Sequence, residues 1–183
     1  MILPFDRSYW VIPGKLLVGE IPSAKDEATR KQKIENLVMM GFDAVINLME
    51  AEERTFSGEL LVDYTDDLEY FAVRANKIIV IHHHPIKDLS ITTADKMRET
   101  LHLIHNLIED GKKVYVHCWG GVGRTGTVVG CYLLEQNMAS TDTVLQTIDY
   151  LKRTTPISER NSPETDEQIN FVLNWPKLRI LKS

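Results

Sequence analysis

The sequence contains little cysteine, no excess of basic residues and no long apolar run. Two cysteines, Cys118 and Cys131, are too few for a disulfide framework, which argues against a small disulfide-stapled secreted scaffold. The apolar runs are far shorter than the roughly 18 residues that suggest a membrane span. Residues 1–7 also lack a basic segment followed by an apolar one, so we expect no secretion signal.

The charge balance is slightly acidic. Lysine and arginine number 21 against 26 aspartate and glutamate residues, which gives a net charge of -5. This balance does not support general binding to nucleic acid or to anionic membranes, and we expect neither partner. Because an active thiolate would need a reducing compartment, we expect a cytoplasmic protein, and we expect it to be a monomer.

The chain has ordinary globular composition, with 183 residues of which 43% are hydrophobic and 26% charged. Because no repeat or low-complexity linker divides it, we expect a single domain over residues 1–183. The patterns predict strands at residues 9–12, 15–18, 43–49, 78–81 and 114–116. They predict helices at 23–40, around 68–72, at 92–110, at 126–135, from 141, and from the Ser162-Pro163 pair.

The order of these elements indicates the fold class. A strand, a helix ended by Gly41 and a further strand form an αβ repeat, which favours a sheet covered on both faces. We therefore expect an α/β fold with a central, mostly parallel mixed sheet flanked by helices. In detail, Ser23 is expected to cap the first helix, Thr92 with Asp95 the third, and Pro163 to take the first position of the last.

The most informative stretch runs from the strand at 114–116 into the apolar helix that follows Thr125. Between them lies a loop that begins with Cys118, contains three glycines and ends with Arg124. Such a loop at a helix N-terminus can turn its backbone N–H groups inward to bind an anion. Those N–H groups and Arg124 favour the thiolate form of Cys118 over the thiol. They could also bind three phosphoryl oxygens, two of them on the planar fork of Arg124.

The stretch His117-Cys118-Trp119-Gly120-Gly121-Val122-Gly123-Arg124-Thr125-Gly126 resembles the His-Cys-x-x-Gly-x-x-Arg-Ser/Thr-Gly signature of the cysteine-dependent protein tyrosine phosphatases, in their compact dual-specificity-like branch. The resemblance implies two-step hydrolysis of a phosphorylated protein through a phosphocysteine, with no metal and no cofactor. It implies catalytic roles for Cys118 and Arg124, and substrate binding by residues 119–124. It further implies that Thr125 assists the sulfur and that His117 orders the loop.

A second catalytic group must protonate the leaving oxygen and then activate water, because alkoxides and phenolates leave poorly. Asp88 follows a predicted strand and precedes a helix, and His-Pro-Ile-Lys-Asp resembles the Pro-x-x-Asp general-acid loop of dual-specificity phosphatases. The family often has tryptophan or phenylalanine where this chain has His84. The alternative is that Asp88 only caps the following helix, in which case Asp66 and Asp67 are the next candidates.

Four further features of the sequence could bear on function. We interpret the acidic residues between 50 and 69 as a solvated surface. Consecutive histidines at 82–84 would point to opposite faces of a strand, which argues against a metal site. Gln168 resembles the glutamine that positions water in larger tyrosine phosphatases, with a plain helix surface as the alternative, and Cys131 is interpreted as a small core residue.

The variable loop positions bear on the substrate. Trp119 and Val122 offer no charge to a phosphoinositide, and Gly123 stands where related RNA triphosphatases have asparagine. Phosphotyrosine is therefore expected, with phosphoserine or phosphothreonine if the cleft is shallow. The alternatives are a phosphopeptide-binding module with little turnover, an inositol polyphosphate phosphatase, which would need a strongly basic rim that the acidic balance argues against, and a rhodanese-like sulfur transferase.

Overall fold

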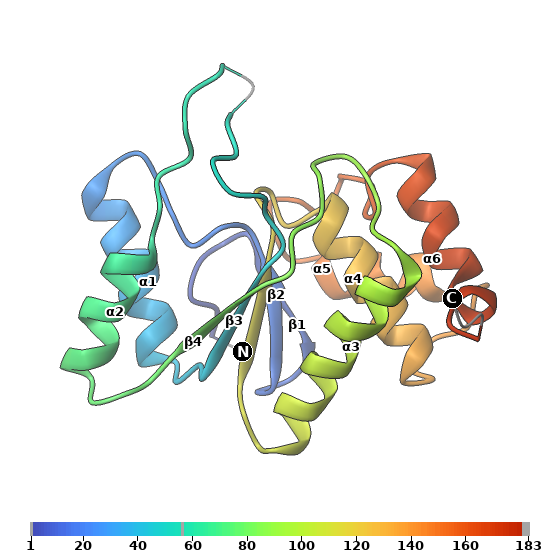
Figure 1. Cartoon of the computed structure of the whole chain (residues 1–183), viewed down its shortest axis with the longest axis horizontal. Helices are drawn as coiled ribbons and strands as arrows, with labels where there is room; N and C mark the ends of the chain where they lie inside the picture. The colour runs from blue at the N-terminus through green and yellow to red at the C-terminus, as the bar shows by residue number, and fades with distance from the viewer. Residues whose placement is uncertain (1, 56, 181–183) are drawn as a thin grey trace.

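A computed structural model of the chain describes residues 2–55 and 57–180, and its strands form a five-stranded sheet (Figure 1). The strands are β1 (Ser8–Ile12), β2 (Leu16–Gly19), β3 (Ala44–Asn47), β4 (Val80–His83) and β5 (Val114–His117). Their order across the sheet is β1-β2-β5-β3-β4, with β1 antiparallel to β2 and every other pair parallel. The expected mostly parallel mixed sheet is confirmed.

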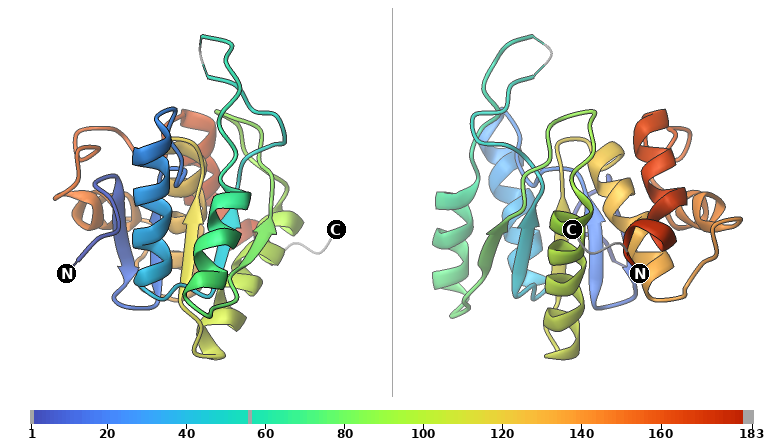
Figure 2. Two further views of the ribbon diagram at one scale, coloured as in Figure 1. Left: turned by 90° about the vertical axis from the view of Figure 1, so that its left-hand side faces the viewer. Right: turned by 45° about the vertical axis from the view of Figure 1, so that its right-hand side comes forward.

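Helices cover both faces of this sheet, as expected. They are α1 (Glu27–Met39), α2 (Thr65–Arg74), α3 (Ala94–Glu109), α4 (Gly123–Glu135), α5 (Val144–Lys152) and α6 (Asp166–Leu178). Helices α1 and α2 lie together on one face, and α3 to α6 lie on the other (Figure 2). Within the described residues, no helix is both long and apolar enough to cross a bilayer.

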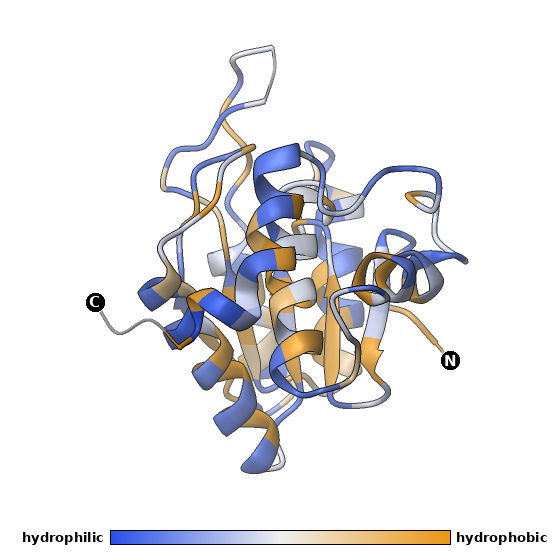
Figure 3. Ribbon diagram, turned by 90° about the vertical axis from the view of Figure 1, so that its right-hand side faces the viewer, coloured by the Kyte–Doolittle hydropathy of each residue, from blue (hydrophilic) through white to orange (hydrophobic). Residues whose placement is uncertain are grey.

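The central strands are buried on both faces, because successive side chains alternate between the two helical layers. In β5, Tyr115 packs into the α1–α2 layer, whereas Val114 and Val116 pack into the α3–α6 layer. Figure 3 shows the strands largely in the hydrophobic colour behind the helices of the second layer. This two-sided burial explains why the central strands read as continuous apolar runs in the sequence.

Helices α1 and α5 begin three or four residues later than the sequence predicted. Helix α1 begins at Glu27, because Asp26 accepts a hydrogen bond from the N–H of Thr29 and so acts as the N-cap. The expected cap, Ser23, instead donates its hydroxyl to the carbonyl oxygen of Val62, at 2.6 Å. Helix α5 begins at Val144 rather than at residue 141.

The caps of two further helices also differ from prediction. Helix α6 begins at Asp166, where Thr165 and Gln168 form a capping box, so Pro163 lies outside the helix. Helix α3 is capped by Thr93, whose hydroxyl accepts from the N–H of Lys96, and not by Thr92. These shifts arise because a neighbouring hydroxyl or carboxylate satisfies the first-turn N–H groups equally well.

The strand predicted at 78–81 is displaced and is not buried. Strand β4 spans Val80–His83 at the edge of the sheet, and the side chain of Ile78 is 84% exposed. An edge strand is covered by neighbours on one side only, which its apolar composition does not reveal. The position of β4 still matters for function, because the segment after it reaches the site described below.

Candidate active site

The carboxyl ends of β5, β3 and β4 lie next to one another, and hydrogen bonds connect the segments that follow them. The N–H of Leu48 donates to the carbonyl oxygen of His117 at 2.9 Å, and the N–H of Ile86 donates to the carbonyl oxygen of Leu48 at 3.0 Å. Such an edge is where ligand sites form in parallel α/β sheets. The loop that begins at Cys118 is therefore held beside the segments after β3 and β4.

Gly121 determines the path of the backbone in that loop. Its φ is +71°, and a Cβ atom placed there would lie 2.5 Å from the carbonyl carbon of Gly19 at the end of β2. The loop can pass this close to β2 only without a side chain. The carbonyl oxygens of Trp119 and Val122 accept hydrogen bonds from the N–H of Ile21 and the hydroxyl of Ser162, both outside the loop. The loop is thus fixed from two directions.

Cys118 lies at the start of this loop with 3% of its surface exposed. The hydroxyl of Thr125, in the first turn of α4, donates to its Sγ atom at 3.1 Å. The sulfur therefore faces a hydroxyl donor and the N-terminal end of α4.

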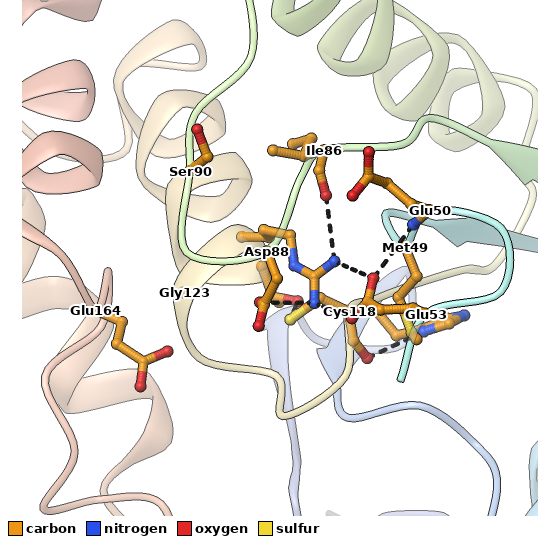
Figure 4. A network of polar contacts seen from close by, with 12 residues as sticks. Met49, Glu50, Glu53, Ile86, Asp88, Ser90, Cys118, Gly123 and Glu164 are labelled. Carbon is orange, nitrogen blue, oxygen red and sulfur yellow. Dashed lines mark hydrogen bonds and ion pairs between the residues drawn. The ribbon is translucent and has the colours of Figure 1, made fainter. Parts of the chain in front are cut away.

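The guanidinium of Arg124, only 1% exposed, is held from three sides, by Glu53, Ile86 and Asp88, which are labelled in Figure 4. Nη1 donates to Oε2 of Glu53 at 2.7 Å and to the carbonyl oxygen of Ile86 at 3.2 Å. Nη2 donates to Oε1 of Glu53 at 2.7 Å and lies 2.9 Å from Oδ1 of Asp88. Burial alone would lower the pKa of Arg124, but the hydrogen bond to Glu53 and the charge of Cys118 raise it.

Asp88 reaches the site from the segment between β4 and α3. Its carboxylate is 37% exposed, in contrast to the buried guanidinium that it contacts. Leu89 follows with a φ of +57°, and the carbonyl oxygen of Ser90 accepts a hydrogen bond from Nε2 of Gln168 at 3.0 Å. The segment that carries Asp88 is thus anchored to α6, while Asp88 itself remains accessible.

His117 lies behind the loop with no exposed surface. Its Nδ1 is 3.2 Å from the carbonyl oxygen of Cys118, so Nδ1 carries the donated proton, and Nε2 accepts from the hydroxyl of Tyr64 at 2.7 Å. Burial, with the charge of Arg124, lowers the pKa of His117 to about 3. The ring is therefore a neutral brace for the loop at ordinary pH.

A cavity of about 460 Å³ opens over Cys118. Beside the loop residues and Asp88, apolar side chains form much of its wall, namely Ile21, Ala24, Leu60, Leu61, Val62 and Leu89. Three basic residues also line it, Arg7, Lys25 and Arg160. Each is paired with a carboxylate, Glu20, Glu59 and Glu164 respectively. The slightly acidic composition of the chain therefore did not indicate that these three basic side chains line the cavity.

The structure brings most of the predicted site residues to this cavity. Cys118, Asp88 and Arg124 line it, as do Trp119, Gly120, Val122 and Gly123. Gly121 lies against β2, His117 supports the loop from behind, and Thr125 contacts the sulfur, so these residues shape the site without forming the cavity wall. Asp66 and Asp67 lie in the first turn of α2 outside the wall, and Asp67 pairs with Arg30 at 2.7 Å.

Sequence reasoning missed Glu53. The acidic residues between 50 and 69 were interpreted as a solvated surface, but the side chain of Glu53 is only 10% exposed and pairs with Arg124 through both oxygens. One sequence signal could have indicated this. Glu53 lies in the segment that follows the strand predicted at 43–49, at the carboxyl edge of the predicted sheet. The loop that carries Arg124 begins at the same edge.

Gln168 does not form the plain helix surface that was one of its two interpretations, because it has no exposed surface. Its Oε1 accepts from the N–H groups of Glu164 and Thr165, and its Nε2 donates to the carbonyl oxygen of Ser90. The side chain thus connects the start of α6 with the segment that carries Asp88. Cys131 is fully buried in the core, as expected.

Strand β4 contains His82 and His83, and His84 follows its last residue. His84 Nδ1 is 2.8 Å from the hydroxyl of Thr100 on α3, and burial lowers the pKa of His84. Across residues 2–55 and 57–180, no three histidine, cysteine or acidic side chains are grouped as metal ligands would be. The absence of a metal requirement stays a prediction.

Comparison with known proteins agrees with this geometry. The family model described as "Polymorphic toxin system, DSP-PTPase phosphatase" matches residues 22–138, which is more than half of the chain. The solved structure of Tk-PTP in its active form has a TM-score of 0.67 and 25% sequence identity, covering 97% of this chain and 99% of that one.

Two curated relatives match over shorter stretches. Cyclin-dependent kinase inhibitor 3 of Sus scrofa is 32% identical over 94 residues, which are 51% of this chain and 42% of that protein. Phosphatidylglycerophosphate phosphatase PTPMT2 of Arabidopsis thaliana is 30% identical over 120 residues, which are 66% of this chain and 44% of that protein. The matched segments therefore span less than half the length of these relatives.

The fold, the cysteine loop and the family match together indicate the class of the cysteine-dependent phosphatases. The chain belongs to the DSP-PTPase phosphatase family.

Proposed function

We propose that this protein hydrolyses phosphomonoesters on proteins through a phosphocysteine, with phosphotyrosine as the preferred substrate. The observation that carries the proposal is the position of Cys118. Its sulfur lies at the base of the cavity, accepts a hydrogen bond from Thr125 and is beside the buried guanidinium of Arg124. A thiolate so placed can attack phosphorus while Arg124 and the loop N–H groups of residues 119–124 bind the phosphoryl oxygens.

The reaction has two steps in this proposal. The Cys118 thiolate forms a bond to phosphorus as the bond to the leaving oxygen breaks, and Asp88 gives that oxygen a proton. Asp88 then accepts a proton from water, which attacks the phosphocysteine and releases phosphate, and the hydroxyl of Thr125 stabilises the departing sulfur. We assign the role of general acid to Asp88 because it lines the same cavity as Cys118, whereas Asp66 and Asp67 do not.

The depth and the lining of the cavity support phosphotyrosine. Cys118 is nearly inaccessible, so a substrate must extend its phosphate inward on a long side chain. The wall above it is rich in apolar side chains, including Ile21, Leu61 and Trp119, which suit an aromatic ring better than a hydrophilic alkyl phosphate. We also propose a cytoplasmic location, because a thiolate nucleophile needs reducing surroundings. A monomeric state and the absence of a cofactor stay predictions.

The decisive experiment compares the wild type with Cys118→Ser on a phosphotyrosine peptide. We expect wild-type turnover that persists with chelator and stops with vanadate, and no turnover by Cys118→Ser, because a serine hydroxyl is not ionised near neutral pH. Saturable peptide binding without turnover by either protein would instead identify a phosphopeptide-binding module. Faster turnover of an inositol polyphosphate or of phosphatidylglycerophosphate than of the peptide would overturn the substrate assignment.

Asp88→Asn tests the general acid. We expect kcat to fall by about 10² to 10⁴-fold on a phosphotyrosine peptide, because the amide cannot protonate the leaving oxygen. An activated aryl phosphate, whose leaving oxygen needs no proton, should lose less in its first step. Equal losses on both substrates in single-turnover measurements would show that Asp88 does not act as the acid.

A further inference from the structure

The stretch of chain that carries Asp88 is short, and hydrogen bonds fix it on both sides of that residue. Before Asp88, the N–H of Ile86 donates to the carbonyl oxygen of Leu48 at 3.0 Å. After it, the carbonyl oxygen of Ser90 accepts a hydrogen bond from Nε2 of Gln168 at 3.0 Å. Asp88 lies midway in sequence between these two fixed points (Figure 4). The position of its carboxylate therefore depends on where Ile86 and Ser90 are held.

A tight turn connects Ser90 to Asp88. The N–H of Ser90 donates to the carbonyl oxygen of Lys87 at 3.1 Å, which closes a turn over residues 87–90. Leu89, inside this turn, has a φ of +57°. A residue with a side chain stays in this strained conformation only when the surrounding structure holds it there. The turn therefore needs an external contact, and the bond from Gln168 to Ser90 supplies one.

The amide of Gln168 is itself held in one orientation. Its Oε1 accepts from the N–H groups of Glu164 at 3.1 Å and Thr165 at 3.3 Å, so Nε2 is the end that faces Ser90. The amide also lies against the first residue of α4, because a Cβ atom on Gly123 would be 3.0 Å from Oε1 of Gln168. One buried side chain thus connects the start of α6 with the turn and with the start of α4.

Gln168 has no exposed surface, and it is not part of the cavity wall that the described residues form. A side chain enclosed in this way does not reach a water molecule over Cys118, which is the role that its resemblance to larger tyrosine phosphatases suggests. We propose instead that Gln168 is a positioning residue for the general acid. Its bond to Ser90 keeps the turn of residues 87–90 where Asp88 can reach the leaving oxygen. This inference rests on the proposed function.

The test measures the first chemical step alone, as release of the dephosphorylated peptide in a single turnover with excess enzyme. Gln168→Met keeps the length of the side chain but cannot donate to Ser90. We expect it to slow release from a phosphotyrosine peptide about tenfold, because a slightly misplaced acid transfers its proton poorly. In the Asp88→Asn protein, adding Gln168→Met should cause no further loss, since no acid remains to be misplaced. Equal fold losses in the two backgrounds would overturn the inference.

Thr165→Val is the matched control, because Thr165 belongs to the same capping box. Its hydroxyl accepts from the N–H of Gln168 at 3.2 Å, so the change weakens the start of α6 but leaves the bond to Ser90. Peptide release should stay close to the wild-type rate. A loss as large as that of Gln168→Met would mean that capping of α6 alone explains the effect. Unchanged peptide release with slower phosphate release by Gln168→Met would identify a water-positioning role and would also overturn the inference.

A second measurement uses the wild type and needs no variant. With ¹⁵N in the glutamine side chains, the Nε2 hydrogens of Gln168 should exchange slowly with solvent, both with and without vanadate, because the bond to Ser90 is buried. Fast exchange in either state would show that the bond does not persist in solution and would overturn the inference. A wild type that does not turn over the peptide, even with a slowly exchanging Gln168 amide, would instead refute the proposed function on which the inference rests.

Discussion

At the scale of single residues, the site depends on how one buried guanidinium is held. Arg124 cannot lose its proton, and its burial is tolerated because Glu53 faces it through both oxygens. The same pairing sets the direction in which the remaining N–H groups point. Glu53 therefore acts on the reaction through Arg124, as a positioning residue that does not line the cavity.

Glu53→Gln should lower kcat/KM by about 10²-fold, because a misdirected guanidinium loses the alignment that phosphoryl transfer requires. Glutamine retains one acceptor oxygen but neither the charge nor the second oxygen. Steady-state kinetics on a phosphotyrosine peptide would measure the loss.

Glu52→Gln is the control for this change, since Glu52 is the adjacent residue, carries the same charge and is exposed. Its kcat/KM should stay close to that of the wild type. If the two variants were equally active, the ion pair between Glu53 and Arg124 would have no part in orienting the site.

At the scale of elements, the cysteine loop is shaped by the end of β2. Gly121 passes so close to Gly19 that no Cβ atom fits, and its positive φ adds a second reason for glycine. The same loop is tied to Ile21 and Ser162 through its carbonyl oxygens. The conformation of the cysteine loop therefore depends on β2, β5 and α4 together.

Gly121→Ala should abolish most activity and destabilise the protein by about 1–3 kcal/mol beyond the strain of its positive φ, because the new methyl group overlaps backbone atoms of β2. Urea unfolding and peptide turnover would measure the two effects.

Gly111→Ala is the matched control, because Gly111 has a similar φ of +75° and open space around the position of a Cβ. Gly111→Ala should lower the free energy of unfolding only by the backbone strain of about 1–2 kcal/mol and should keep full activity. Full activity of Gly121→Ala would show that β2 does not constrain the loop.

At the scale of the whole molecule, burial of a neutral histidine links folding to pH. Burial lowers the pKa of His117 to about 3 in the folded protein, whereas an unfolded histidine titrates near pH 6.5. Below pH 6.5 the unfolded chain binds a proton that the folded protein does not bind. The stabilisation present above pH 6.5 is therefore lost as the pH falls towards 3.

The free energy of unfolding should accordingly fall by up to about 1.4 kcal/mol per pH unit between pH 6 and pH 4 on account of His117 alone. Denaturant unfolding over this range would measure the slope for the wild type and for His117→Asn, which cannot be protonated there. His84 and the paired carboxylates are present in both proteins, so their contributions cancel in the comparison. Parallel slopes for the two proteins would contradict a buried neutral His117.

The fold and the nucleophile loop were largely predictable because each depends on residues near in sequence. Apolar runs of strand length and the glycines that end helices identified the strands of the sheet and the helices that cover it. The boundaries were less predictable, as Asp26 and Thr165 show, because several adjacent residues could cap each helix. The edge strand β4 was predicted as buried, because composition reports hydrophobicity and not the number of neighbouring strands.

The sequence alone determined the chemistry of the loop from His117 to Gly126, since a cysteine, glycines and an arginine at that spacing act within a few residues of one another. Only the tertiary structure decided what surrounds it. Glu53 meets Arg124 across 71 positions of the chain, and Gln168 meets Ser90 across 78. Such contacts depend on how the sheet brings distant loops to one edge, and no local pattern of side chains records that arrangement.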